Sequence, residues 1–173
     1  MSVATNLKKA TRQVEKAVTG TEPQTDLLDT LKEEHEEVSA LLKKLTDEDA
    51  SAGERKKLVG QVKAALVPHT KAEQKILYDA IIACKDKDAQ KDGLEGYIEH
   101  ALASKTLADL EKISNAGSAE FLATAKVLKE LVEHHVKEEE SNVWSDAREH
   151  FDADQRKAMN ERYLAEKKKV KLN

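Results

Sequence analysis

The sequence predicts an all-α protein, arranged as an up-down-up-down four-helix bundle with short extra helices at its N- and C-terminal ends. Just over half of the 173 residues are Ala, Leu, Glu, Lys or Arg, a composition typical of long helices. Aromatic residues make up only 3%, which disfavours a sheet-rich fold. In four long segments, apolar residues recur every three or four positions, as they do in helices that bury one face.

Six helical segments are expected, separated by the few turn-forming residues of the chain. Pro68 is expected to kink one of them, because proline removes a backbone hydrogen bond from a helix. The charged stretch 85–93 is expected to be a loop, and Ser118 and Asp152 are expected to cap the helices that follow them. The segments cover about residues 5–18, 25–46, 54–84, 94–113, 119–150 and 152–168.

These segments divide the chain into three parts. Residues 1–23 are expected to form an amphipathic helix and a linker, 24–150 the four-helix bundle, and 151–173 a C-terminal helix with a basic tail. The nearly balanced charge, −4 in total, and the lack of a long apolar run predict neither a nucleic-acid nor a membrane partner. The N-terminus has no continuous apolar core that would mark a secretory signal. The single cysteine, Cys84, fits a reducing compartment, so a cytoplasmic location is expected.

Each of the four apolar seams is interrupted by a histidine. Two of these histidines are followed four residues later by a glutamate, a spacing that places both side chains on one helix face. A glutamate that faces a core is costly unless a partner such as a metal ion compensates its charge. The residues concerned are His35, His69, Glu73, His100, His135 and Glu139.

The spacing of these six residues from the intervening loops predicts that they meet at one level of the bundle. With a rise of about 1.5 Å per residue, the members of each antiparallel pair agree to within roughly one helical turn. Four imidazoles and two carboxylates are too many ligands for one tetrahedral zinc ion. They suit two iron ions bridged by the glutamates, and manganese or zinc could substitute for iron.

At these residues the sequence resembles the hemerythrin-like family, whose members carry the HHE cation-binding domain. The resemblance implies a four-helix bundle that holds a non-haem di-iron centre able to bind O2 or NO. It also implies that the six residues are the metal ligands. The matching segments are LKEEHEEVSALLKKL around His35, HTKAEQKILY from His69, IEH ending at His100, and HVKEEESNVW from His135.

The chain also departs from the oxygen-carrying hemerythrins, which have a second histidine one turn from the first on the third helix. Here the residues one turn on either side of His100 are Gly96 and Ser104. One protein ligand is therefore expected to be missing, and the open position would take water, O2 or peroxide. A histidine placed at residue 96 or 104 is expected to reach the centre. Reversible O2 carriage is disfavoured.

The neighbours of the six residues are given lesser roles. Tyr97 is expected to be either a core aromatic or a hidden ligand, and His134 to lie at the surface or beside a ligand. Tyr78 and Trp144 are expected to pack the end of the bundle. Three glutamates are expected to lie on the solvent face: Glu99, Glu138 and Glu140.

Three functions remain open at this point. The first is a di-iron protein that binds or reacts with O2, NO or peroxide. The second is an enzyme of oxidative or nitrosative stress, either catalase-like or repairing iron centres. The third is an interaction module that signals metal or oxygen status to a protein partner through its terminal segments. A monomer or a small homo-oligomer is expected.

Overall fold

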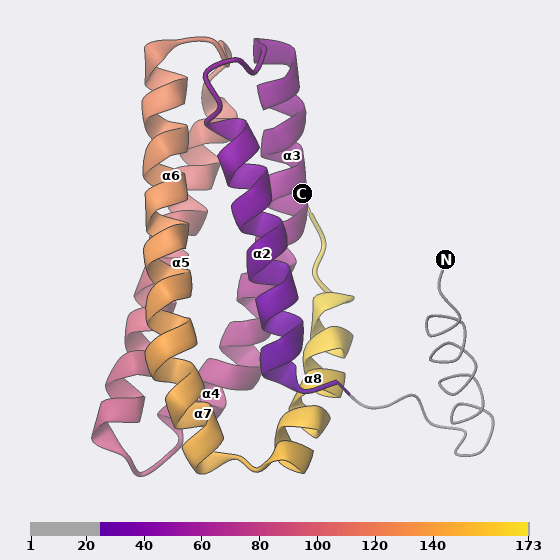
Figure 1. Ribbon diagram of the computed structural model, residues 1–173, viewed down its shortest axis with the longest axis vertical. Helices are drawn as coiled ribbons and strands as arrows, with labels where there is room; N and C mark the ends of the chain where they lie inside the picture. Colours follow the sequence, from indigo (N-terminus) through magenta and orange to yellow (C-terminus); the bar gives the residue numbers. More distant parts are fainter. Residues whose placement is uncertain (1–24, 173) are drawn as a thin grey trace, which may run out of the picture.

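The computed structural model describes residues 25–172, in which every regular element is helical (Figure 1). This confirms the all-α class and a helical bundle, while the amphipathic segment expected at about 5–18 lies outside the described residues. None of the described helices is long and apolar enough to cross a membrane. The elements are α2 (Leu27–Leu45), α3 (Ala52–Glu73), η1 (Gln74–Tyr78), α4 (Asp79–Ile82), α5 (Lys87–Lys112), α6 (Ala119–Glu138), η2 (Glu139–Val143), α7 (Trp144–His150) and α8 (Ala153–Lys167).

Side-chain caps define where the long helices begin. The predicted caps Ser118 and Asp152 accept hydrogen bonds from the backbone N–H groups of Phe121 and Gln155. The prediction of a loop over 85–93 is wrong, because α5 begins at Lys87. The side chain of Asp86 caps this helix by accepting hydrogen bonds from backbone N–H groups of its first turn.

Gly93, the last residue of that expected loop, lies inside α5 for a packing reason. A Cβ atom at this position would lie 2.9 Å from Cγ1 of Ile82, so the absence of a side chain lets α4 approach closely.

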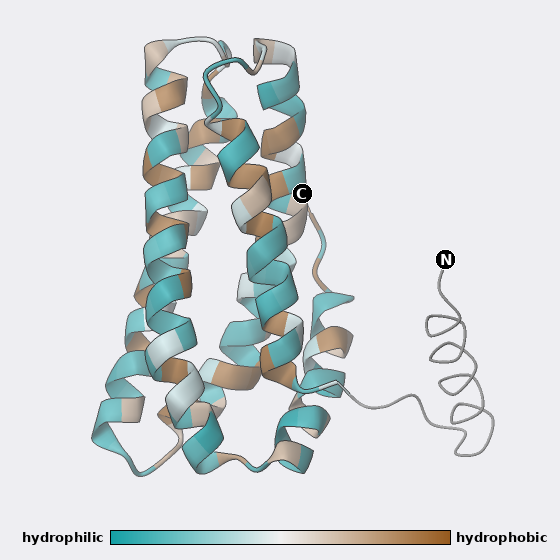
Figure 2. Ribbon diagram, in the orientation of Figure 1, coloured by the Kyte–Doolittle hydropathy of each residue, from teal (hydrophilic) through white to brown (hydrophobic). Residues whose placement is uncertain are grey.

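The long helices pack around a common core, with α2 against α3 and α6, and α5 against α6 and α3. Teal and brown alternate along these helices in Figure 2, as expected where one face is buried. The buried apolar residues form two separate clusters. One includes Leu31 and Ile76, and the other includes Val38 and Leu66. The residues between these clusters are polar, so a polar layer divides the hydrophobic core.

Two expected helices change type within this polar layer. The segment expected at 54–84 continues as α3 through Pro68 to Glu73 and then becomes the π-helical segment η1. The segment expected at 119–150 becomes π-helical at Glu139, in η2. A π-helical turn holds an extra residue and therefore shifts the face on which later side chains lie. Both changes occur at the glutamates of the two His-x-x-x-Glu pairs.

The C-terminal helix α8 lies beside α2 and α3 (Figure 1). Arg156 forms an ion pair with Asp26 at 2.9 Å, and the side chain of Asn160 donates a hydrogen bond to the carbonyl oxygen of Thr25 at 3.0 Å. Tyr163 is fully buried beneath this helix. Helix α8 thus covers the side of the bundle formed by α2 and α3.

Gly96 lets the ring of Tyr78 lie directly against α5. A Cβ atom at residue 96 would lie 2.6 Å from two ring carbons of Tyr78. The expectation that a histidine at residue 96 would reach the centre is therefore wrong, because Tyr78 fills that space. The same expectation for residue 104 is wrong for another reason, since Ser104 is exposed.

We predict that Gly96→Ala destabilises the protein although alanine favours helices. The clash with Tyr78 should cost about 1–3 kcal/mol, while helix propensity returns up to about 1 kcal/mol. The free energy of unfolding, measured in urea, should therefore fall. Ser104→Ala, a change on the exposed face of the same helix, is the control and should leave it unchanged or slightly raised. Equal stability of Gly96→Ala and wild type would contradict the close contact with Tyr78.

Candidate metal centre

The six residues singled out by the sequence come together in the polar layer of the core. Each is at most 6% exposed. Potential ligand atoms of Glu73, His100, His135 and Glu139 all lie within 4.8 Å of one another. Those of His35, His69 and Glu73 form a second such group, so Glu73 belongs to both.

Each buried glutamate lies between two histidines from different helices. Oε2 of Glu73 is 3.4 Å from Nε2 of His69 and 3.3 Å from Nε2 of His100. Oε2 of Glu139 is 3.1 Å from Nε2 of His135 and 3.8 Å from Nε2 of His35. Both carboxylates therefore occupy positions from which they could bridge two cations.

Three of the four histidines are held from behind by a carboxylate at Nδ1. Glu34 lies 3.0 Å from Nδ1 of His69, and Glu99 lies 2.9 Å from Nδ1 of His135. Glu140 lies 3.0 Å from Nδ1 of His35. Such partners fix the ring orientation and leave Nε2 free to face the centre.

Two of the glutamates assigned to the solvent face therefore contact the site instead. The expectation for Glu99 and Glu140 is wrong, since each supports a histidine of another helix. Glu138 is half-buried and accepts a hydrogen bond from Asn142. His134 is exposed and lies 3.3 Å from Glu99, which agrees with its expected place at the surface.

Helix α8 adds a second layer of contacts behind His69. The phenol of Tyr163 donates a hydrogen bond to Glu34 at 2.6 Å and lies 3.1 Å from Nδ1 of His69. Lys167 forms an ion pair with Glu34 at 2.7 Å. Burial opposes ionisation of Glu34, but its contacts with His69, Lys167 and Tyr163 lower its pKa to about 2. The carboxylate that holds His69 is therefore charged throughout the neutral range.

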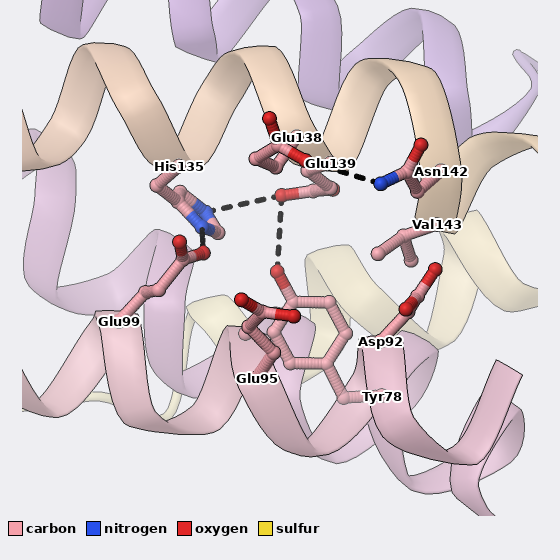
Figure 3. Close-up of a pocket in the computed structure, with 10 residues that line it drawn as sticks. Tyr78, Asp92, Glu95, Glu99, His135, Glu138, Glu139, Asn142 and Val143 are labelled. Carbon is pink, nitrogen blue, oxygen red and sulfur yellow. Dashed lines mark hydrogen bonds and ion pairs between the residues drawn. The ribbon is translucent and has the colours of Figure 1, made fainter. Parts of the chain in front are cut away.

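Two aromatic side chains hold the carboxylate of Glu139. Tyr78 donates a hydrogen bond to Oε2 at 3.1 Å, and Nε1 of Trp144 donates one to Oε1 at 3.0 Å (Figure 3 shows the contact of Tyr78). Both residues were expected only to pack the bundle end, so this role was missed. Tyr97, expected to be either a core aromatic or a hidden ligand, packs against an apolar cluster. Its phenol donates a hydrogen bond to Asp79 at 2.7 Å and lies 3.2 Å from the carbonyl oxygen of Gln74, away from the centre.

The buried donor atoms are incompletely satisfied by the protein itself. Both carboxylate oxygens of Glu73 and Nε2 of His35 are buried without a hydrogen-bond partner among the described residues. Unpaired buried polar atoms cost free energy, whereas a bound cation would satisfy them directly. The nitrogen and oxygen donors, with no thiolate among them, suit iron, manganese or zinc. The residues present thus fit a metal.

Protons compensate part of the negative charge of the site when no metal is bound. Burial favours neutral imidazole, but Glu73 and Glu34 raise the pKa of His69 to about 10. In the same way, Glu139 and Glu99 outweigh burial and raise the pKa of His135 to about 9. Burial lowers the pKa of His100. Without metal, two of the imidazoles therefore carry protons at neutral pH.

Comparison with known proteins gives one match. The model of a family described as the hemerythrin HHE cation binding domain matches residues 26–144, more than half of the chain. No curated protein and no solved structure matches. The matched range includes all six core residues but ends before α8, so the contacts of Tyr163 and Lys167 lie outside the part that the family describes.

We predict that Tyr163→Phe weakens metal binding without unfolding the protein. Loss of the phenol frees Glu34 and His69 to move, and loss of such supporting groups typically costs about 10–100-fold in metal affinity. Affinity for Fe2+ should be measured by anaerobic competition with a chelator. Tyr97→Phe removes a phenol that does not contact the centre and should retain wild-type affinity. Equal affinities of the two variants would show that α8 does not support the site.

A further prediction concerns protons. Nε2 of His69 and of His135 must lose its proton before it can bind a metal. Because the pKa values are about 10 and about 9, loading at neutral pH should release close to two protons per chain. The apparent affinity should then rise with pH until about pH 9–10. An indicator dye in weakly buffered solution measures this release, and loading without it would contradict the protonated metal-free state.

Proposed function

Because the chain belongs to the hemerythrin HHE cation-binding family and is therefore a metal-binding domain, we propose that it is a non-haem di-iron protein that binds or reacts with O2, NO or peroxide. One observation supports this proposal more strongly than the others. Two groups of buried donor atoms overlap at Glu73, which is the arrangement needed for two neighbouring cations with a shared carboxylate.

The proposed ligands divide between two metal positions. One position is formed by His100, His135, Glu139 and Glu73, and the other by His35, His69 and Glu73. Glu139 also approaches His35, at 3.8 Å, and would be the second bridge. With Glu139 counted at both, each position would have four protein donors, which leaves room for a small ligand.

The surroundings of the site suit reactions with small oxidants. Iron would supply redox chemistry, and the protein supplies buried donor atoms between two apolar clusters. The apolar clusters on both sides of the polar layer, which include Leu31, Val38 and Leu66, limit the entry of water. Tyr78 and Trp144 hold Glu139 in a fixed orientation.

Turnover of peroxide, as in a catalase-like enzyme, is a second candidate. It is favoured by the lack of a second histidine one turn from His100, where the chain has Gly96 and Ser104. Tyr78 fills the space at Gly96. With fewer nitrogen donors than the oxygen carriers have, the iron ions would be coordinatively unsaturated. An unsaturated centre favours reaction over reversible carriage.

The finer features of the fold and the cellular location are also proposals. The packing of α2 on α3 and α6, and of α5 on α6 and α3, supports the up-down-up-down order of four helices. Residues 24–150 would form this bundle, and α8 would be an added C-terminal helix. A cytoplasmic location rests on the lone cysteine, Cys84.

We predict that protein from iron-rich growth contains close to two iron ions per chain, as measured by elemental analysis. Glu73→Gln should lose most of both, because Glu73 belongs to both donor groups. Glu130→Gln, an exposed change on α6, should retain both and is the control. Visible spectra recorded after reduction and exposure to O2, NO or peroxide then distinguish binding from turnover. Folded wild-type protein without metal would overturn the proposal.

A further inference from the structure

A narrow pocket connects the candidate metal centre with the surface between α5 and η2 (Figure 3). Tyr78, His135 and Glu139 line its inner part, and the exposed residues Glu95 and Asn142 line its outer part. The pocket has a volume of about 20 Å³, which is enough for about one water molecule. It therefore admits only one small ion or molecule at a time.

The outer part of this pocket carries negative charge. Asp92, Glu95, Glu99 and Glu138 all line it, and none of the ten lining residues is a lysine or arginine. Within the described part of the chain, neither Asp92 nor Glu95 forms an ion pair. Lys87 and Lys91 line a neighbouring groove, which Glu95 and Glu99 also line.

The inner end of the pocket leads to the candidate ligands of the centre. His135 and Glu139 belong to the group whose ligand atoms lie within 4.8 Å of one another and that includes Glu73. Both oxygens of Glu73 are buried without a hydrogen bond. A row of carboxylates thus leads from the surface to a buried carboxylate with unsatisfied oxygens.

The other sides of the centre are covered. Helix α8 packs over α2 and α3, where Tyr163 is fully buried. The two apolar clusters close the bundle on either side of the polar layer. The acidic pocket is therefore the short path from solvent to the donor atoms on the side of α5 and η2.

We propose that this acidic pocket is the route by which Fe2+ enters the centre, and that it selects small ligands by charge. The inference rests on the proposed function. Clefts lined by one sign of charge concentrate ions of the opposite sign and raise their association rates by about 10–10³-fold. An ion that sheds water to enter so narrow a space finds carboxylate oxygens in place of that water. Neutral O2, NO and peroxide pass, whereas anions are repelled.

The chain contains its own reporter for a test of this route. Trp144 is the single tryptophan of the sequence, and its ring stacks on His35 with centroids 5.9 Å apart. Its fluorescence should change when iron binds next to it. Mixing metal-free protein with Fe2+ under anaerobic conditions in a stopped-flow instrument would therefore measure the rate of loading.

The decisive comparison uses two double variants with the same change of charge. Asp92→Asn with Glu95→Gln neutralises the pocket, and Glu36→Gln with Glu37→Gln neutralises two exposed residues of α2. At low salt the pocket variant should load Fe2+ about 10-fold more slowly, with a weaker dependence on salt. It should bind the anion azide about 10-fold faster once loaded, consume peroxide at the wild-type rate, and reach the wild-type iron content. The α2 variant should match wild type in all four measurements.

Three results would overturn the route. An unchanged loading rate in the pocket variant, or equal slowing in the α2 variant, would show that the pocket does not guide the ion. A lower final iron content in the pocket variant would show that its carboxylates hold metal rather than conduct it. In these cases the di-iron function stands, because wild type still binds iron. A wild-type protein that takes up no iron would overturn both proposals.

Discussion

The burial of two carboxylates, those of Glu73 and Glu139, is the constraint on which the rest of the structure depends. An isolated buried charge is too costly to persist without partners. Here each carboxylate lies between two imidazoles, and three of the four imidazoles are held by a further carboxylate at Nδ1. This layered set of charges cannot mix with apolar side chains. The hydrophobic core is consequently divided into two clusters, one on each side of the polar layer.

The π-helical segments explain how two helices each provide a core glutamate and an aromatic side chain that contacts Glu139. In each case an aromatic residue follows the glutamate at the fifth position, Tyr78 after Glu73 and Trp144 after Glu139. Five residues are close to one turn of a π-helix, so the aromatic residue remains on the inner face. Both aromatic side chains then donate hydrogen bonds to Glu139. A regular α-helix would place the fifth residue on a different face.

The sequence predicts the centre better than its surroundings, and the reason is physical. His35, Glu73 and the other core residues follow the 3.6-residue period of a buried helix face, a local property of the chain. Glu99 and Glu140 lie next to such residues, so their helical positions suggested solvent, and only the crossing of helices brings them to a histidine. Tyr163 is separated from His69 by 94 residues, and no local pattern reports such a contact. The early start of α5 was missed because the charged stretch 85–93 was interpreted as a loop, whereas Asp86 caps the helix and Gly93 is a packing contact inside it.

An excess of negative charge is shared by the six core residues, by the carboxylates that hold their histidines and by the pocket that leads to them. Carboxylates outnumber permanent cations around the polar layer, and protons on His69 and His135 compensate part of this excess when metal is absent. Metal ions would replace these protons, so the acidic surroundings favour a cation before any ligand bond forms. One turn from His100, the ring of Tyr78 lies against Gly96. The phenol narrows the space beside Glu139 without adding positive charge, and the pocket above it remains acidic. The contact between Tyr78 and Gly96 thus shapes the side of the site that faces solvent.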